Sequence, residues 1–263
     1  MMSNLSQPVF HFVSFLTLAA IGTAAHASKS SFEPYLQPSV ETFLNMSDVN
    51  TFDNFDLRGT VTDTLGTIAS AVGKDNFGPY IDISYNLAVQ GMKSESSRLR
   101  ESAFCFFAVM ASVLKEGFNH VLPEIVPSIL DTLKQEDIDF GDKVTEEQAK
   151  ALLNGNGEEL DLVDTDDDDE SIELNVNSAL QVEKEIAADS LGEIFTNTRE
   201  AFLPYLEEST KQLLELSDTF YEGARKSSLS ALWKFVSTLG EMQCNEPWQP
   251  GLPLVYRSFV IAG

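Results

Sequence analysis

The sequence predicts an all-α fold in which antiparallel helix pairs stack into a superhelix. Three observations support this prediction. A Phe-x-Pro-Tyr-Leu motif recurs, a second apolar marker precedes each copy at a similar distance, and apolar residues between the markers follow helical spacing. Recurrence of a motif with a period of roughly 20 to 50 residues is typical of repeat folds.

The two markers keep one phase along the chain. The first reads FEPYL at 32–36, FGPYI at 77–81 and FLPYL at 202–206, with a looser copy, FNHVL, from Phe118. Its phenylalanines are 45, 41 and 84 residues apart, and the last interval is two periods or one period with an insertion. The second marker is a quartet with apolar first and last residues. Its copies are LAAI 18–21, LGTI 65–68, FAVM 107–110, LGEI 191–194 and LWKF 232–235.

Each repeat is expected to be two helices joined at the Phe-x-Pro-Tyr-Leu corner. In residues 99–117 apolar side chains recur at steps of three and four, as on one face of a helix, and Gly117 is the expected stop. The prolines Pro34, Pro79 and Pro204 stand where second helices should begin, because a first-turn N–H has no helical partner to lose. The tyrosine and leucine that follow should pack back on the first helix. Pairs of this length predict a HEAT-repeat α-solenoid.

The chain divides into four parts on this pattern. Residues 1–136 hold about three helix pairs, 137–176 an acidic insertion, 177–245 about one and a half helix pairs, and 246–263 an irregular tail. The apolar run that ends in Ala25-His26-Ala27 imitates a signal-peptide cleavage site, but no basic residue precedes it. We therefore interpret this run as the first helix of repeat one, and secretion is the alternative.

The charge balance points to basic protein partners. The chain holds 41 Asp and Glu against 17 Lys and Arg, a net charge of −24. Residues 131–173 alone contain 17 acids and three lysines, and a block of this kind is expected to be disordered because it repels itself. An acidic surface repels nucleic acid and lipid headgroups, so neither nucleic-acid binding nor membrane insertion is expected.

The acidic insertion is the candidate binding site, because loops on rigid scaffolds often carry function. A solvated loop without a specific partner is the alternative. The candidate residues are Glu158, Glu159, Asp161, Asp164, Asp166, Asp167, Asp168, Asp169 and Glu170. A calcium site is not expected, because Asp169 stands where an EF-hand loop needs glycine and Asn175 where it needs a bidentate acid.

Neither catalytic, cofactor-binding nor metal-ligating residues are expected. The sequence contains no GxGxxG, Walker, GxSxG or HExxH motif. Its two cysteines, Cys105 and Cys244, match no metal spacing and favour a reducing compartment. We expect a binding protein and not an enzyme. The favoured interpretation of Trp233 is a core residue; for Trp233 and Trp248 the alternative is an anchor for a partner.

Two stretches resemble a known family. LRESAFCFFAVMASVLKEGFNHVLPEIVPSILDTL at 99–133 and ALQVEKEIAADSLGEIFTNTREAFLPYLEESTKQLLEL at 179–216, with the acidic block between them, resemble the importin-β superfamily of karyopherins and within it the fungal beta-4 branch. The resemblance covers roughly residues 10–250. Members of this family are several times longer, so the chain is expected to correspond to their middle repeats.

The resemblance implies a part in nuclear import. It implies basic cargo, such as ribosomal proteins or histones, on a concave surface built from second helices that include 120–135 and 204–216. It also implies contacts with Phe-Gly nucleoporins, release of cargo by the small GTPase Ran, and shuttling between cytoplasm and nucleus. A HEAT-repeat scaffold without a transport role and an acidic, histone-chaperone-like binding protein remain alternatives.

Overall fold

The computed structural model describes residues 6–47, 55–135 and 168–245, and within these ranges the chain forms helices and turns without a strand. It separates into two compact units, residues 1–118 and residues 119–263. The boundary falls at the corner of the third predicted helix pair. The all-α prediction is confirmed.

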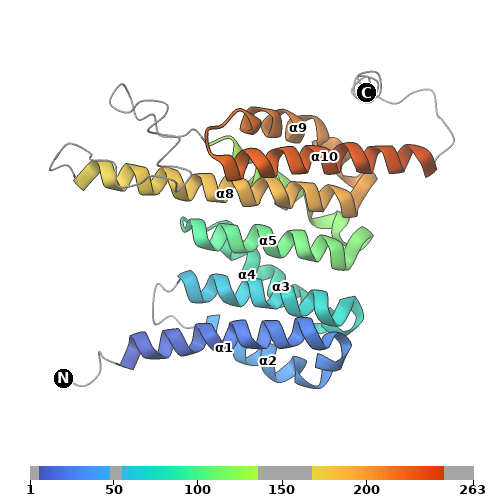
Figure 1. The fold of residues 1–263 in the computed structure, drawn as a ribbon. Helices are drawn as coiled ribbons and strands as arrows, with labels where there is room; N and C mark the ends of the chain where they lie inside the picture. Colours follow the sequence, from blue (N-terminus) through green and yellow to red (C-terminus); the bar gives the residue numbers. More distant parts are fainter. Residues whose placement is uncertain (1–5, 48–54, 136–167, 246–263) are drawn as a thin grey trace. The chain divides into compact units, whose positions relative to one another are not determined.

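The first unit has two layers of helices. The helices α1, α3 and α5 lie side by side in one layer, while α2 packs against α3, and α4 against α3 and α5 (Figure 1). Short 3-10 helices, η1 and η2, join α1 to α2 and α3 to α4, and η3 follows α5. The bounds are α1 Ser6–Ser28, η1 Lys29–Phe32, α2 Glu33–Ser47, α3 Phe55–Phe77, η2 Gly78–Tyr80, α4 Ile81–Met92, α5 Ser97–Leu114 and η3 Lys115–Val121.

The second unit repeats this plan with longer first helices. The helix α8 lies beside α10, α9 packs on α10 and on α6, and α6 packs on α8 (Figure 1). Its elements are α6 Leu122–Leu133, α8 Asp168–Thr198, η5 Arg199–Phe202, α9 Leu203–Ser217 and α10 Glu222–Asn245. Alternation of first and second helices therefore holds within each unit.

The prolines begin the second helices as predicted. Pro34 and Pro204 lie in the first turn of α2 and α9, and Pro79 lies in η2, directly before α4. In each of these corners the phenylalanine ring contacts the ring of the following tyrosine, with centroids 6.0 Å apart for the first two corners and 5.8 Å for the last. The recurring motif is therefore a recurring ring contact.

One part of the corner prediction is wrong. Leu36 and Leu206 are buried, but the side chain of Tyr35 is 63% exposed, although its ring contacts that of Phe32. Adjacent residues on a helix point about 100° apart. At the first corner Leu36 therefore takes the buried face, and Tyr35 lies at its exposed margin.

Three of the first helices, α1, α5 and α8, are each followed by a residue with positive φ. Lys29, Lys115 and Arg199 have φ of 50°, 49° and 47°, and each stands three residues before its corner phenylalanine. The predicted stop at Gly117 is therefore wrong, because α5 ends at Leu114 and Lys115 turns the chain. A left-handed conformation costs a non-glycine residue roughly 1–2 kcal/mol. A cation at this end of a helix offsets part of that cost through the partial negative charge of the last carbonyls.

The first residue of four of the five quartets lies in the core, and Leu232 of the fifth is half-buried. Leu18, Leu65, Phe107 and Leu191 are fully buried. The apolar N-terminal run thus forms α1 and packs on α3, as the repeat interpretation predicted. The core prediction for Trp233 is wrong: its side chain is 71% exposed, and Phe235, two residues later, takes the buried position at 3%.

The start of α8 differs from the predicted limit of the acidic insertion. The helix begins at Asp168, so residues 168–176, assigned to the insertion, are helical. Acidic residues are favourable at this end of a helix, because the unpaired N–H groups of the first turn carry partial positive charge. Residues 136–167, and the tail from residue 246, lie outside the described part of the chain.

Candidate functional site

The structure places three of the nine predicted site residues. Asp168, Asp169 and Glu170 form the start of α8. The other six lie outside the described residues, and they are Glu158, Glu159, Asp161, Asp164, Asp166 and Asp167. The geometry near the site is therefore that of the helices on either side of the insertion.

These two helices are tied together by a buried polar contact. The hydroxyl of Thr132, near the end of α6, donates a hydrogen bond to Oε1 of Glu183 in α8 at 3.2 Å. The Glu183 side chain is fully buried, and neighbouring Lys184 is only 5% exposed. A buried carboxylate is stable only with hydrogen-bond or ionic partners, so this contact holds α6 and α8 in one register. The chain on either side of the insertion is thus fixed in the second unit.

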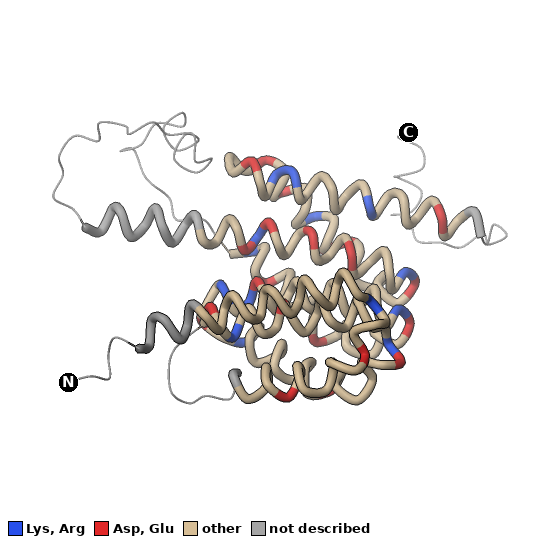
Figure 2. Tube along the Cα trace, turned by 60° about the horizontal axis from the view of Figure 1, so that its bottom comes forward, with Lys and Arg blue, Asp and Glu red and all other residues tan. Residues whose placement is uncertain are grey.

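An excess of acid lies on the second helices of this unit. We name it the second-helix surface, and its charged residues are Glu124, Asp131, Lys134, Glu207, Glu208, Lys211 and Glu215. Lys134 Nζ lies 2.9 Å from Glu208 Oε1, and Lys211 Nζ lies 3.9 Å from Glu215 Oε1. The surface therefore carries five acids and two lysines. Figure 2 shows acidic and basic residues interspersed on the helices of this unit.

The Lys134–Glu208 pair shifts the titration of both groups. Their mutual hydrogen bond raises the pKa of Lys134 and lowers the pKa of Glu208. The hydrogen bond therefore favours the charged form of each group. Sequence reasoning missed this pair, because the partners are far apart in the chain and neither residue belongs to a motif.

A second acidic group joins α8 to the start of α10. Burial, and then the neighbouring carboxylate of Asp189, raise the pKa of Glu185. Ser227 donates a hydrogen bond to Asp189 Oδ2 at 3.0 Å, and burial followed by Glu185 raises the pKa of Tyr221. A Cβ on Gly223 would collide with the Glu185 carboxylate, so glycine leaves the room for that group. The arrangement packs the two helices together.

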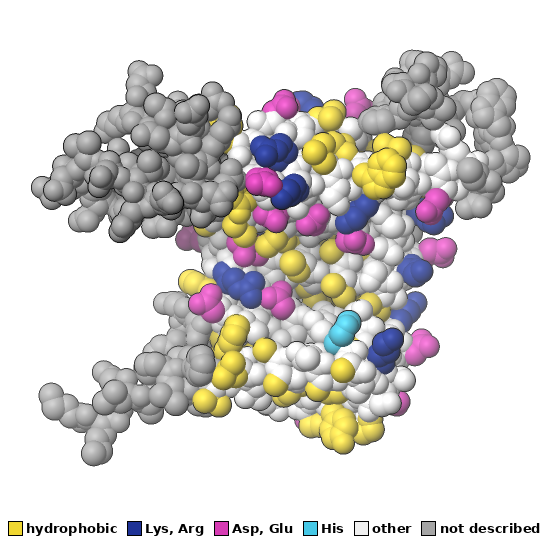
Figure 3. Space-filling view, viewed as in Figure 1, with side chains coloured by type: hydrophobic (Ala, Val, Ile, Leu, Met, Phe, Trp, Pro, Cys, Tyr) yellow, Lys and Arg dark blue, Asp and Glu magenta, His cyan; other side chains and the backbone are white. Residues whose placement is uncertain are grey.

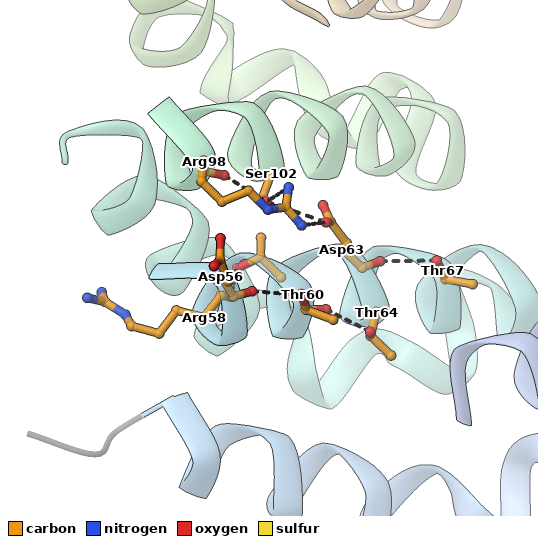
Figure 4. Close-up of polar contacts among 9 residues, drawn as sticks. Asp56, Arg58, Thr60, Asp63, Thr64, Thr67, Arg98 and Ser102 are labelled. Carbon is orange, nitrogen blue, oxygen red and sulfur yellow. Dashed lines mark hydrogen bonds and ion pairs between the residues drawn. The ribbon is translucent and has the colours of Figure 1, made fainter. Parts of the chain in front are cut away.

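The first unit has its own polar contact between first helices, shown in Figure 4. Arg98 Nη2 on α5 lies 2.8 Å from Asp63 Oδ2 on α3, and Arg98 Nη1 donates to Ser102 Oγ at 2.8 Å. Gly59 faces this group, and a Cβ there would lie 2.8 Å from Ser102 Oγ. The threonines of α3 bond to carbonyls one turn back, as Thr64 does to Thr60 at 2.7 Å. This cluster is satisfied internally and holds α3 against α5.

Other kinds of site are not supported in the described part of the chain. It contains no group of three or more His, Cys, Asp or Glu placed to hold a metal ion. None of the helices there is long and apolar enough to cross a membrane. A shallow apolar groove runs along α1, lined by Val13, Leu16, Thr17, Ala20, Ile21 and Ala24.

Comparison with known proteins gives several matches. The chain is 43% identical over 244 residues to the probable importin subunit beta-4 of Schizosaccharomyces pombe, covering 90% of this chain and 22% of that protein. It is 26% identical over 233 residues to importin-4 of Mus musculus, covering 85% of this chain and 21% of that one. The chain thus spans about a fifth of the length of these relatives.

A solved structure with a similar fold comes from the same kind of protein as the sequence relatives. The crystal structure of Kap121p bound to Pho4p matches with a TM-score of 0.66 and 22% identity, over 95% of this chain and 22% of that one. No protein-family model matches the chain. The solenoid of helix pairs and the long alignment to a beta-4 importin agree with the resemblance found in the sequence. The chain belongs to the importin-β superfamily.

Proposed function

We propose that the chain is a segment of a nuclear transport receptor that binds basic cargo proteins, such as ribosomal proteins or histones. The observation that carries the proposal is the 43% identity to an importin subunit beta-4 across 90% of the chain. Kap121p, whose fold is similar, is bound to Pho4p in its crystal structure. A solenoid of this kind can therefore hold a protein partner.

Electrostatics supports basic cargo. The net charge is −24, and residues 131–173 contribute 17 acids against three lysines. The second-helix surface adds an excess of acid beside the insertion, and both would attract and orient a cationic protein. We propose that the nine candidate acids of the insertion contact the cargo, while α6 and α8 hold the ends of the insertion in place.

The proposal includes the partners of the family. Phe-Gly nucleoporins would carry the receptor through the pore, and the small GTPase Ran would release the cargo in the nucleus. The protein would then shuttle between cytoplasm and nucleus. An acidic histone-chaperone-like function is the second candidate, favoured by the acidic insertion. Addition of Ran–GTP separates the two, since a transport receptor releases its cargo and a chaperone keeps it.

A binding assay with core histones tests the proposal. We expect binding at physiological salt that weakens as the ionic strength rises. Replacing Asp166, Asp167, Asp168 and Asp169 with Asn should weaken binding about fourfold or more, because each exposed ion pair contributes about 0.2–1 kcal/mol. Absence of binding by the folded chain would contradict the cargo proposal.

A charge-matched control separates the insertion from net charge. The control variant is Glu33→Gln, Glu41→Gln, Asp56→Asn and Asp82→Asn, which neutralises four exposed acids of the first unit. It changes the net charge as much as the insertion variant does. We expect its affinity for histones to stay near that of the parent. An equal loss in both variants would assign binding to overall charge and would remove the insertion from the site.

A further inference from the structure

A lysine of the chain itself already occupies one acid of the second-helix surface. Lys134 directly follows α6, and its Nζ lies 2.9 Å from Oε1 of Glu208 on α9. Both side chains are partly exposed, at 44% and 42%, so the pair can be reached by a partner. The contact therefore places a cation where a basic side chain of a partner would otherwise bind to Glu208.

Oxygen Oε1 of Glu208 has a second donor on its own helix. Gln212 Nε2, one turn further along α9, donates a hydrogen bond to the same oxygen at 3.4 Å. A carboxylate offers about four lone-pair positions, two on each oxygen. Lys134 and Gln212 both use Oε1, so they fill the positions of that oxygen and not those of Oε2.

The two kinds of basic side chain make different demands on such a carboxylate. An arginine guanidinium is a planar fork that binds both carboxylate oxygens at once, through two parallel N–H···O bonds. A lysine ammonium is a compact point charge, and one oxygen is enough for it. With Oε1 of Glu208 filled, an ammonium can still bind to Oε2, whereas a guanidinium cannot make its forked contact until Lys134 leaves.

Ion pairs on the first helices of the same unit provide a comparison. Lys and Arg lie beside Asp and Glu over α8 and α10 in the view of Figure 3. Among them, Lys226 pairs with Glu222, one turn before it on α10. This lysine can be neutralised with the same change in net charge as Lys134, but without any change at Glu208.

We propose that Lys134 is an intramolecular competitor that keeps the arginine side chains of a partner from binding to Glu208 in the forked geometry. The contact is autoinhibitory toward arginine, and it makes this position of the second-helix surface favour lysine. The inference rests on the proposed function, because it concerns which basic partner the surface accepts.

The binding of two synthetic peptides to the full chain tests the proposal in a Lys134→Met variant. Methionine keeps much of the length of the side chain and removes its charge. We expect the affinity for a hexa-arginine peptide to rise about two- to fivefold, the effect of one partly exposed ion pair that no longer competes. The affinity for a hexalysine peptide should rise by a smaller factor. In a Glu208→Gln background, Lys134→Met should change neither affinity, and urea unfolding checks that each variant is folded.

Lys226→Met is the matched control, since it removes one positive charge from α10. We expect it to raise the two peptide affinities slightly and equally. Gains of equal size in the Lys134→Met and Lys226→Met variants would assign the effect to net charge and overturn the proposal. Equal gains for both peptides in Lys134→Met, or no binding of hexa-arginine by any variant, would overturn it too. Failure of the transport proposal would look different, because the chain would not bind core histones while the arginine preference of Lys134→Met would remain.

Discussion

The two units share one corner motif but place their aromatic rings differently. In the second unit Phe202 lies 5.2 Å from Phe195 and 5.8 Å from both Phe235 and Tyr205, measured between ring centroids. In the first unit the corner rings of Phe32 and Phe77 contact their own tyrosines. There a second cluster forms on α4 and α5 from Tyr85, Phe106 and Phe107. The motif thus specifies the corner, while the neighbouring helices decide how much core the corner carries.

The two units also differ in how closely their first helices approach each other at the glycine of the quartet. Gly66 in the first unit leaves room for a methyl group, since the nearest atom to a Cβ there would be 3.5 Å away. Gly192 in the second unit does not, since Lys234 Cδ would be 3.0 Å and Ala231 Cα 3.2 Å away. Equivalent glycines therefore have different roles, and only one of them is required for close packing.

The largest expected effect comes from removing a buried ring in each unit. Phe107→Ala and Phe202→Ala should each lower the free energy of unfolding by about 3–5 kcal/mol, because both rings are fully buried. Hydrogen exchange should show the loss of protection in the unit that carries the substitution, since each unit has its own core. The control is Phe55→Ala, whose ring is 39% exposed. Equal loss in both units would show that they unfold together.

The glycine pair should give effects of opposite sign. Gly192→Ala should destabilise the chain by about 1–3 kcal/mol, because overpacking forces α8 and α10 apart. Gly66→Ala should stabilise it by about 0.5–1 kcal/mol, because alanine favours a helix interior over glycine. Urea unfolding of the two variants measures both values. The comparison fails if both substitutions change stability in the same direction.

The ion pair between α3 and α5 and the one between α8 and α10 should differ modestly in coupling energy. A double-mutant cycle of Arg98→Met with Asp63→Asn should give a coupling energy of about 1–2 kcal/mol, because Ser102 holds the guanidinium in the geometry in which it donates a charged hydrogen bond to Asp63. The cycle of Lys234→Met with Glu193→Gln should give about 0.2–1 kcal/mol, as for exposed pairs. Added salt should reduce the second value more. A larger coupling in the second unit would contradict this ranking.

The smallest expected effects are two pH dependences of opposite sign in the second unit. Glu208 has a lowered pKa, so its contribution to stability is present above the ordinary carboxyl pKa of 4.5 and is lost as pH falls through the folded-state value. Glu185 has a raised pKa, so its ionisation opposes folding above that raised value, and the penalty disappears as pH falls toward 4.5.

Two glutamine variants test these signs. At neutral pH, Glu208→Gln should destabilise the chain and Glu185→Gln should stabilise it. The Glu185→Gln difference should shrink as pH falls toward 4.5, whereas the Glu208→Gln difference should persist there and shrink only below pH 4.5. Urea unfolding at neutral pH, at pH 4.5 and at a lower pH measures the differences. Lys226 lies near Glu185 and favours its charged form. A destabilised Glu185→Gln variant at neutral pH would show that this attraction outweighs the cost of burying the carboxylate.

Much of the fold was predictable because packed helices bury apolar residues at regular intervals in the sequence. Leu18, Leu65, Phe107 and Leu191 were placed in one register from the quartets alone, and all four are buried. The prolines located the second helices, because the ring is tolerated in a first turn and excluded from the interior. The N-terminal run was predicted to be the first helix because its quartet falls in register with the others, although its composition imitates a secretion signal.

The errors concern which side of an element is covered. Trp233 sits in a quartet, so its apolar character predicted burial, yet the covered residue is Phe235. Gly117 has the usual chemistry of a helix stop, yet Lys115 turns the chain. Hydrophobicity and local propensity identify a helix, but they do not say whether another helix lies over a given residue.

The candidate site was predictable only as composition. The acidic block is visible in the sequence, and three of its nine selected residues begin α8. The contacts that hold α6 against α8 and α9 were not predictable, because Thr132–Glu183 and Lys134–Glu208 join residues that are distant in the chain. The buried Glu183 looks like one more surface acid in the sequence.

The sequence by itself determined the period, the corners and the inward-facing first residue of four of the five quartets, since these depend on interactions within a few turns of helix. Only the tertiary structure decided that Glu183 is buried, that Gly192 is required and that Trp233 is exposed. The physical reason is that burial depends on what a neighbouring helix places opposite a residue. A repeat makes successive helices similar, but it does not make their neighbours the same.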